Sequence, residues 1–220
     1  MLKALLSFGL ALPLLAGDPA ASKPRVKFTT NLGAFTVELE PEAAPKTVAN
    51  FLKYVRAGHY TNTTFHRVIP TFMIQGGGHL KDLSEKPAPD TVENEADLSL
   101  AKGLKNTRGT VAMARTMDPN SASAQFFVNT VDNPFLDHRS KDPRGWGYCV
   151  FGRVVEGMET VDRIKDVPTG MAPNGMRDVP RTPVVITSAK ELGGTATAGS
   201  KAKPKPKVKA APPSPGSRQG

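Results

Sequence analysis

The chain has 220 residues, of which 39% are hydrophobic and 22% charged, and its formal net charge at pH 7 is +9. Six of these positive charges lie in residues 193–220, a segment without any acidic residue, which leaves +3 for the rest of the chain. The basic balance therefore gives no reason to expect specific nucleic-acid binding by the remainder. The single cysteine, Cys149, excludes an intramolecular disulfide, and its place in an apolar run favours a packed side chain over a reactive thiol.

The chain opens with one lysine and an apolar run from Ala4 to Ala16 that ends in small residues. This run is too short to cross a bilayer comfortably, and its position is typical of a secretory signal. We therefore expect residues 1–22 to be a signal peptide with an unassigned cleavage site, and the protein to be exported and periplasmic. An uncleaved membrane anchor is the alternative.

Residues 26–39 alternate between apolar and polar positions around a turn at residues 31–33, which predicts a β-hairpin. Pro45 then suits the first turn of a helix, whose apolar stripe ends before Gly58. Short β-like runs follow at residues 65–69, 72–75, 110–114, 125–129, 148–154 and 184–188, with a second helix at 158–164. Many short strands with two helices indicate one domain over residues 25–192, built on an antiparallel sheet that is closed or nearly closed. The polar residues 78–108 between them predict a long surface or functional loop.

One stretch, FHRVIPTFMIQGGG at residues 65–78, combines large apolar side chains with Arg67 and Gln75, which need partners. Its three glycines are not followed by the lysine of a phosphate loop, so a tight bend after a strand is the better interpretation. The four histidines of the chain have no metal-binding spacing. We interpret His66 as a strand residue with a hydrogen bond, in preference to a ligand or a base.

The remaining candidate residues are apolar or neutral and surround one cation: Arg67, Phe72, Met73, Gln75, Met113, Ala114, Gln125, Phe127, Phe135 and Leu136. None of them titrates or attacks near neutral pH, which excludes acid–base, nucleophilic and metal chemistry. Rotation about an X-Pro peptide bond, with a barrier of about 18–20 kcal/mol, needs no such group. A guanidinium that hydrogen-bonds the prolyl nitrogen would favour the twisted state. Taken singly, the apolar residues would fit a core, and Arg67 would fit a structural salt bridge.

Five segments occur in the order found in the cyclophilin-type peptidyl-prolyl cis-trans isomerases: FHRVIPTFMIQGG, GTVAMA, SAQFFVN, FLD and YCVFGRVVEGM. The chain resembles this family over residues 25–192, and most of all its exported members from Gram-negative bacteria. The resemblance implies a mainly β fold, a closed eight-stranded antiparallel β-barrel capped by two α-helices. It also implies a substrate groove on the outside of the barrel, and neither a cofactor nor a metal.

Position by position, the resemblance implies that Arg67 is catalytic, together with Phe72 and Gln75. It assigns a second set of residues to substrate binding: Met73, Met113, Ala114, Arg115, Gln125, Phe127, Phe135, Leu136 and Tyr148. Two positions differ from many eukaryotic members of the family. Those members have a tryptophan where this chain has Phe135, and a groove histidine where it has Tyr148. The loss of the indole N–H donor predicts weak binding of cyclosporin.

The implied partners are proline-containing peptides and unfolded or folding exported proteins, bound by a monomer. A cyclophilin-like domain that only holds such clients, without useful catalysis, is the rival interpretation, and Arg67 and Gln75 argue against it. The composition of residues 193–220 predicts a disordered, basic tail with partly polyproline II character. This tail serves either for contact with a polyanion or as a solubilising linker.

Overall fold

The computed structural model describes residues 23–193 of the chain. The predicted signal peptide (1–22) and all but the first residue of the predicted tail (193–220) lie outside the described residues.

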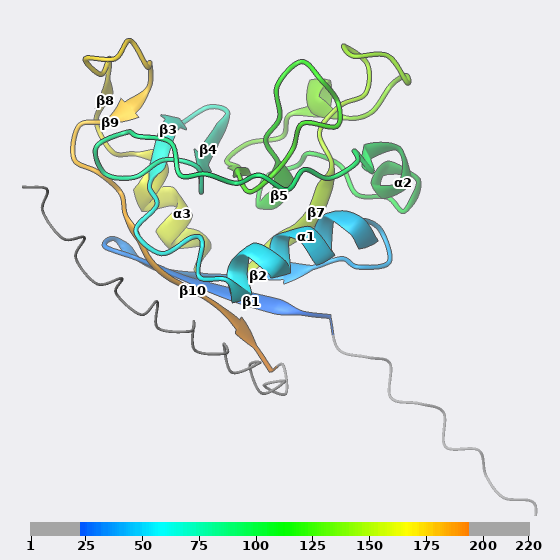
Figure 1. Cartoon of the computed structure of the whole chain (residues 1–220), viewed down its shortest axis with the longest axis horizontal. Coiled ribbons are helices and arrows are strands. Elements are labelled where there is room, and N and C mark those ends of the chain that lie inside the picture. Colours follow the sequence, from blue (N-terminus) through cyan, green and yellow to red (C-terminus); the bar gives the residue numbers. More distant parts are fainter. Residues whose placement is uncertain (1–22, 194–220) are drawn as a thin grey trace, which may run out of the picture.

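Eight strands form one antiparallel sheet in the order β10-β1-β2-β7-β5-β6-β4-β3. The strands are β1 (Arg25–Thr30), β2 (Gly33–Leu39), β3 (Phe65–Ile69), β4 (Met73–Gly76), β5 (Thr110–Met113), β6 (Phe126–Asn129), β7 (Val150–Glu156) and β10 (Ile186–Leu192). The predicted hairpin is confirmed as β1 and β2, which pair from Arg25↔Glu38 to Thr30↔Gly33. Figure 1 shows β1, β2 and β10 running together along one side of the molecule.

The two edge strands of this sheet, β3 and β10, meet only at one end. Backbone hydrogen bonds join Asn62 N to Ile186 O (2.8 Å), Ile186 N to Thr63 O (2.8 Å) and Phe65 N to Val184 O (2.9 Å). Further along β3, Val68 N donates instead to Asp178 O at 2.8 Å. The segment before β10 thus occupies the edge that closure would require. The eight-stranded antiparallel sheet is confirmed, whereas a fully closed barrel was too strong an expectation.

The two longer helices are α1 (Pro45–Arg56) and α3 (Met158–Lys165), close to the predicted ranges. Three elements were not predicted: a short helix α2 (Ala96–Ala101) inside the expected loop, and the two-residue strands β8 (Thr169–Gly170) and β9 (Val179–Pro180), which pair with each other. A single 3₁₀ turn, η1 (Pro134–Leu136), precedes β7. No helix within residues 23–193 has the length and apolar character that crossing a bilayer requires.

The sheet has a separate apolar cluster on each of its faces. The main core contains most of the aromatic residues, including Phe28, which stacks on Phe35 with ring centres 5.2 Å apart. The second cluster consists of Met73, Ala112, Phe127, Leu136 and Val150. Because successive side chains of a strand point to opposite faces, Phe126 joins the main core and Phe127 the second cluster. The second cluster therefore lies on the outer face of the curled sheet.

Candidate active site

A shallow pocket of about 120 Å³ opens over the second apolar cluster. Nine residues line it: Arg67, Phe72, Met73, Gln75, Ala114, Arg115, Phe127, Leu136 and Tyr148. All nine were predicted as site residues from the sequence. They come from β3, β4, β6, η1 and the loops next to β4, β5 and β7. The structure thus brings together residues that are up to about eighty positions apart in the chain.

The apolar part of this pocket is formed by side chains that the fold holds tightly. Met73, Phe127 and Leu136 are only 2%, 4% and 7% exposed. The ring of Tyr148 meets that of Phe127 edge-on, with centres 5.7 Å apart. Close packing on both sides gives these side chains little freedom to rearrange. The pocket is therefore preformed and suits a small apolar ring.

Arg67 stands at the rim of the pocket with its side chain 42% exposed. Its guanidinium carbon lies 5.9 Å from the centre of the Phe72 ring. Its Nε lies 3.8 Å from Asp178 Oδ2, and the side chain of Asp178 is 40% exposed. This separation exceeds hydrogen-bond length, so the ion pair does not occupy the donors of the guanidinium. The contact thus leaves the guanidinium partly exposed and its donors available.

Gln75 and Gln125 lie beside the arginine and are joined by a hydrogen bond from Gln75 Nε2 to Gln125 Oε1 of 3.0 Å. Gln125 borders a neighbouring pocket of about 180 Å³, which shares Gln75, Ala114 and Arg115 with the first. The predicted bend after β4 is confirmed, since Gly77 has φ +88°. A Cβ on Gly78 would lie 2.3 Å from the Gln125 side chain. The glycines thus turn the chain and leave room for the glutamine.

Arg115 also lines the pocket, but its guanidinium is held by backbone carbonyls. Nε donates to Gly147 O (2.9 Å), and Nη1 to Thr116 O (2.8 Å). Its Cζ lies 4.7 Å from the centre of the Tyr148 ring. These contacts use its donors to fix two loops. Of the two pocket arginines, Arg67 is therefore the one whose donors are not used by backbone carbonyls of residues 23–193.

Besides Gln125, two further predicted binding residues do not line the pocket. Phe135 is 59% exposed and stacks on Phe72, with ring centres 5.6 Å apart and an angle of 26°. It extends the apolar rim beyond the pocket. Met113 is 2% exposed and belongs to the main core, because the alternation along β5 turns Ala112 outward and Met113 inward. A direct contact between Met113 and a substrate stays a prediction.

A buried network of asparagines supports the site and was not predicted from the sequence. Asn129 Nδ2 donates to Thr110 Oγ1 (2.9 Å) and Asn106 Oδ1 (3.2 Å). Asn133 Nδ2 donates to Asn129 Oδ1 (2.8 Å) and Phe72 O (2.9 Å). The network thereby fixes the backbone of Phe72 and the start of η1. The only sequence signal is an asparagine at the end of the apolar run FFVN.

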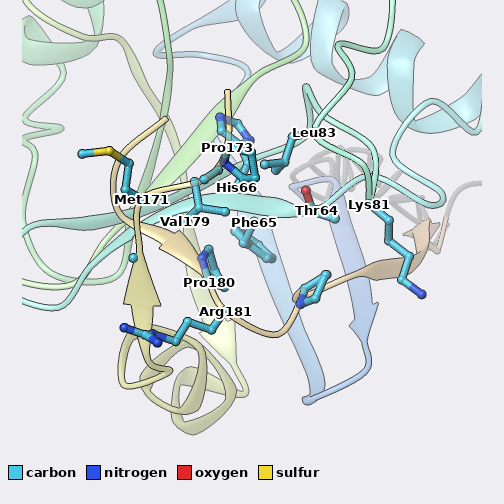
Figure 2. A pocket seen from close by; sticks show the side chains of 13 residues that line it. Thr64, Phe65, His66, Lys81, Leu83, Met171, Pro173, Val179, Pro180 and Arg181 are labelled. Atoms are coloured by element: carbon cyan, nitrogen blue, oxygen red, sulfur yellow. The ribbon is translucent and has the colours of Figure 1, made fainter. Parts of the chain in front are cut away.

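A larger cavity, of about 370 Å³, lies on another side of β3 (Figure 2). Figure 2 shows His66 and Phe65 on one side of it, facing Val179, Pro180 and Arg181 of the segment around β9. None of the predicted site residues lines this cavity. The smaller pocket is the candidate active site, because it combines the exposed arginine, the glutamine and the apolar cluster.

His66 is a strand residue, as predicted, and is 3% exposed. The hydrogen bond expected for it is missing at Nδ1, which has no partner among residues 23–193. Burial, followed by the nearby ring of His79, lowers the pKa of His66 to about 4. The imidazole is therefore neutral at pH 7. Within the same residues, no group of three or more His, Cys, Asp or Glu side chains is placed to hold a metal ion.

Cys149 is buried, as predicted, and burial raises its pKa to about 12. A thiol with such a pKa forms almost no thiolate at neutral pH, so it does not act as a nucleophile.

Comparison with known proteins agrees with this geometry. The family model described as cyclophilin type peptidyl-prolyl cis-trans isomerase matches residues 25–191. The chain is 57% identical over 168 residues to the peptidyl-prolyl cis-trans isomerase cyp18 of Streptomyces antibioticus, which covers 76% of this chain and 98% of that protein. It is 52% identical over 164 residues to peptidyl-prolyl cis-trans isomerase B of Escherichia coli, and this match covers 74% of this chain and 96% of that protein.

Solved structures show the same fold. A cyclophilin-type isomerase of Cryptosporidium parvum, crystallised in the presence of the dipeptide Ala-Pro, superposes with a TM-score of 0.61 at 27% identity, covering 75% of this chain and 96% of that one. The cyclophilin AquaCyp293 of Hirschia baltica superposes with a TM-score of 0.58 at 28% identity, covering 76% of this chain and 73% of that one. Since the family model and these relatives match nearly all of the described residues, this chain belongs to the cyclophilin-type peptidyl-prolyl cis-trans isomerases.

Proposed function

We propose that this isomerase accelerates rotation about X-Pro bonds in unfolded or folding exported proteins, and that Arg67 is its principal catalytic residue. One observation carries the proposal: a half-exposed guanidinium stands beside a preformed apolar pocket of about 120 Å³. The pocket suits a proline ring, and the arginine reaches whatever lies at its rim. The Ala-Pro dipeptide named for the Cryptosporidium relative supports a proline-containing ligand.

The chemistry follows from the origin of the rotational barrier. Amide resonance keeps the X-Pro bond planar, and resonance is lost when the prolyl nitrogen becomes pyramidal in the twisted state. The nitrogen then gains a lone pair that can accept a hydrogen bond. Arg67 would donate this bond only in the twisted state, which lowers the barrier without tightening ground-state binding.

The other site residues hold the substrate while its bond rotates. Phe72, Met73, Phe127 and Leu136 would enclose the ring, and Gln75, held by Gln125, would bind a neighbouring carbonyl. A rate increase of five decades needs roughly 7 kcal/mol, which one charge-assisted donor and fixed orientation can supply together.

Replacement of the arginine tests this mechanism. We expect Arg67→Ala to lower kcat/KM for a short proline peptide at least about 100-fold, or roughly 2.7 kcal/mol of transition-state stabilisation. A protease-coupled assay of cis-to-trans conversion measures it, and Arg181→Ala, at the larger cavity, is a matched control. A well-folded Arg67→Ala variant that keeps more than a third of the activity would refute the role of this residue.

The site of action is part of the same proposal. Residues 1–22 would direct export and be removed, and residues 25–192 would act as a monomeric isomerase domain in the periplasm. Mass spectrometry of the protein from a periplasmic fraction tests this, since the mature chain should begin near residue 23. Recovery of a chain that begins at Met1 would contradict the removal of residues 1–22. A dimer in size-exclusion chromatography would contradict the monomeric state.

A further inference from the structure

Arg67 has one nearby partner that no motif of the sequence indicated. Asp178, directly before β9, has its Oδ2 3.8 Å from the Nε of Arg67. Both side chains are about two-fifths exposed. An ion pair with such exposure contributes little to stability, so a purely structural role would have little effect. The position of the carboxylate relative to the guanidinium indicates a role in orienting Arg67.

The carboxylate faces the Nε edge of the guanidinium. At 3.8 Å the carboxylate makes no hydrogen bond, and it attracts the planar guanidinium electrostatically from the Nε side, away from both terminal nitrogens. The ring of Phe72, 5.9 Å from Cζ, limits the same group on a second side. The electrostatic attraction and the ring act from different directions and together favour one orientation of the donors.

The backbone of Asp178 is itself held firmly. Its carbonyl accepts a hydrogen bond of 2.8 Å from Val68 N, the residue after Arg67 in β3. The next two residues, Val179 and Pro180, form β9 and pair with β8. Figure 2 shows Val179 and Pro180 beside the β3 residues Phe65 and His66. The carboxylate is thus kept near Arg67 by the backbone, without needing the energy of the ion pair.

We infer that Asp178 is a positioning residue, which orients the guanidinium of Arg67 so that its terminal N–H groups face the pocket. This inference rests on the catalytic role proposed for Arg67. Loss of the carboxylate frees the guanidinium to rotate away from the substrate, and a small misplacement of a catalytic group costs severalfold in rate. A carboxylate also weakens the field of its cation, and this effect alone would make the enzyme faster when the carboxylate is removed. If Asp178 positions Arg67, removal of the carboxylate must therefore lower kcat/KM and not raise it.

Asp178→Asn is the informative variant, because asparagine tolerates the positive φ of 60° at this position. We expect it to lower kcat/KM about three- to tenfold, mainly through kcat, and Asp178→Glu to restore at least half of the loss. Asp90→Asn is the matched control, since Asp90 also pairs with a surface cation, Lys53, and also accepts a hydrogen bond at its carbonyl, from Tyr54. The control should stay within about 1.5-fold of the unmodified enzyme.

The same substitution in the Arg67→Ala background separates positioning from structure. If Asp178 acts through Arg67, Asp178→Asn should change the residual kcat/KM of Arg67→Ala less than twofold, measured at proportionally higher enzyme concentration. Asp178→Gly, which also fits a positive φ, repeats the test should the asparagine variant fold poorly. Equal losses in both backgrounds, no loss, or a faster enzyme would overturn the inference. If Arg67→Ala itself stays active, the proposed function fails instead, so the two failures can be told apart.

Discussion

Phe135 shows how a single ring sets the character of the groove rim. It is 59% exposed, and its ring stacks on that of Phe72. The rim at this point is therefore apolar and carries no hydrogen-bond donor. A tryptophan in this place would present the same kind of surface and add an indole N–H.

We expect cyclosporin to bind this enzyme weakly and Phe135→Trp to strengthen the binding. One additional hydrogen bond to a buried acceptor is worth about 1–3 kcal/mol, or roughly five- to 150-fold in Kd. Titration of inhibitor against isomerase activity measures this, with Phe135→Leu as a control that changes the ring but adds no donor. Equal affinity for cyclosporin before and after the tryptophan substitution would contradict the role of the donor.

His66 illustrates the cost of burying a titratable group. Its pKa is lowered from 6.5 to about 4, first by burial and then by the neighbouring His79. Between these pH values the unfolded chain binds a proton that the folded protein does not. The free energy of unfolding therefore falls as the pH decreases from about 6.5 towards about 4.

Replacing His66 by methionine should remove this part of the acid sensitivity. We expect the fall in unfolding free energy between pH 7 and pH 4 to be smaller in His66→Met by up to about 3 kcal/mol, the equivalent of the lowered pKa. Urea unfolding at several pH values measures the free energy of unfolding of both proteins. The contribution of the carboxylates, which both proteins share, cancels in the difference between them. Parallel pH dependences of the two proteins would show that His66 does not carry the effect.

The residues of the pocket were largely predictable, and those that support it were not. Arg67 and Gln75 are conspicuous in the sequence because polar side chains interrupt an apolar run. Asp178 and Asn133 lie in segments without such contrast, and they reach the site only through the path of the chain. Met113 carries the right chemistry, but the alternation of β5 turns it inward. Local pattern reveals a chemical group, whereas its partners depend on tertiary structure.

At the scale of elements, α1 shows why the long segment before β5 matters. The residue before α1 is Ala44, which offers no side-chain cap. The backbone N–H groups of Lys46 and Thr47, which have no partner within the helix, donate instead to the carboxylate of Glu95, at 3.0 and 2.8 Å. Glu95 is 7% exposed and stands directly before α2. The segment expected to be a surface loop thus supplies the N-terminal cap of the main helix.

We expect Glu95→Ala to lower the free energy of unfolding by about 2 kcal/mol, because it leaves buried N–H groups at the helix N-terminus without an acceptor. Glu95→Gln, which keeps an acceptor oxygen, should lose about half as much. Thermal and urea unfolding measure both variants. Activity well below the midpoint should stay within about twofold, since Glu95 does not line the pocket. An alanine variant as stable as the unmodified protein would show that the cap is dispensable.

The elements that sequence patterns missed are those too short to show a period. α2 has six residues, and β8 and β9 have two each. A helical stripe needs about two turns to be recognised, and an alternating pattern needs about four residues. β10 was predicted at residues 184–188 and lies at Ile186–Leu192, because Val184 accepts a hydrogen bond from β3 and Val185 bonds to Asn31, beyond the end of β1. The longer helices and the hairpin show full periods and were predicted nearly correctly.

At the scale of the whole molecule, charge divides the chain more clearly than shape does. Surface cations of the described domain are offset by nearby carboxylates, as in Arg25–Glu38, Lys53–Asp90 and Arg108–Asp162. The segment after residue 192 carries six cationic side chains and no acidic residue. Attraction to a polyanion should therefore depend mainly on the tail, while catalysis depends on the domain.

We propose that the tail, with five lysines alternating with alanine, proline or valine, binds anionic surfaces such as lipopolysaccharide without affecting the active site. Several cations that neutralise phosphates together give binding that weakens steeply with salt. Truncation after Leu192 should leave kcat/KM for a short neutral peptide within about twofold, and the truncated enzyme should leave a heparin column at a clearly lower salt concentration.

A variant with the five lysines changed to glutamine is the matched control, since it keeps the length of the tail and removes most of its charge. Elution of the truncated enzyme together with the full chain would show that the domain itself binds the polyanion. A collapse of activity towards the neutral peptide would show that the tail contributes to the catalytic site, which would contradict the separation of roles.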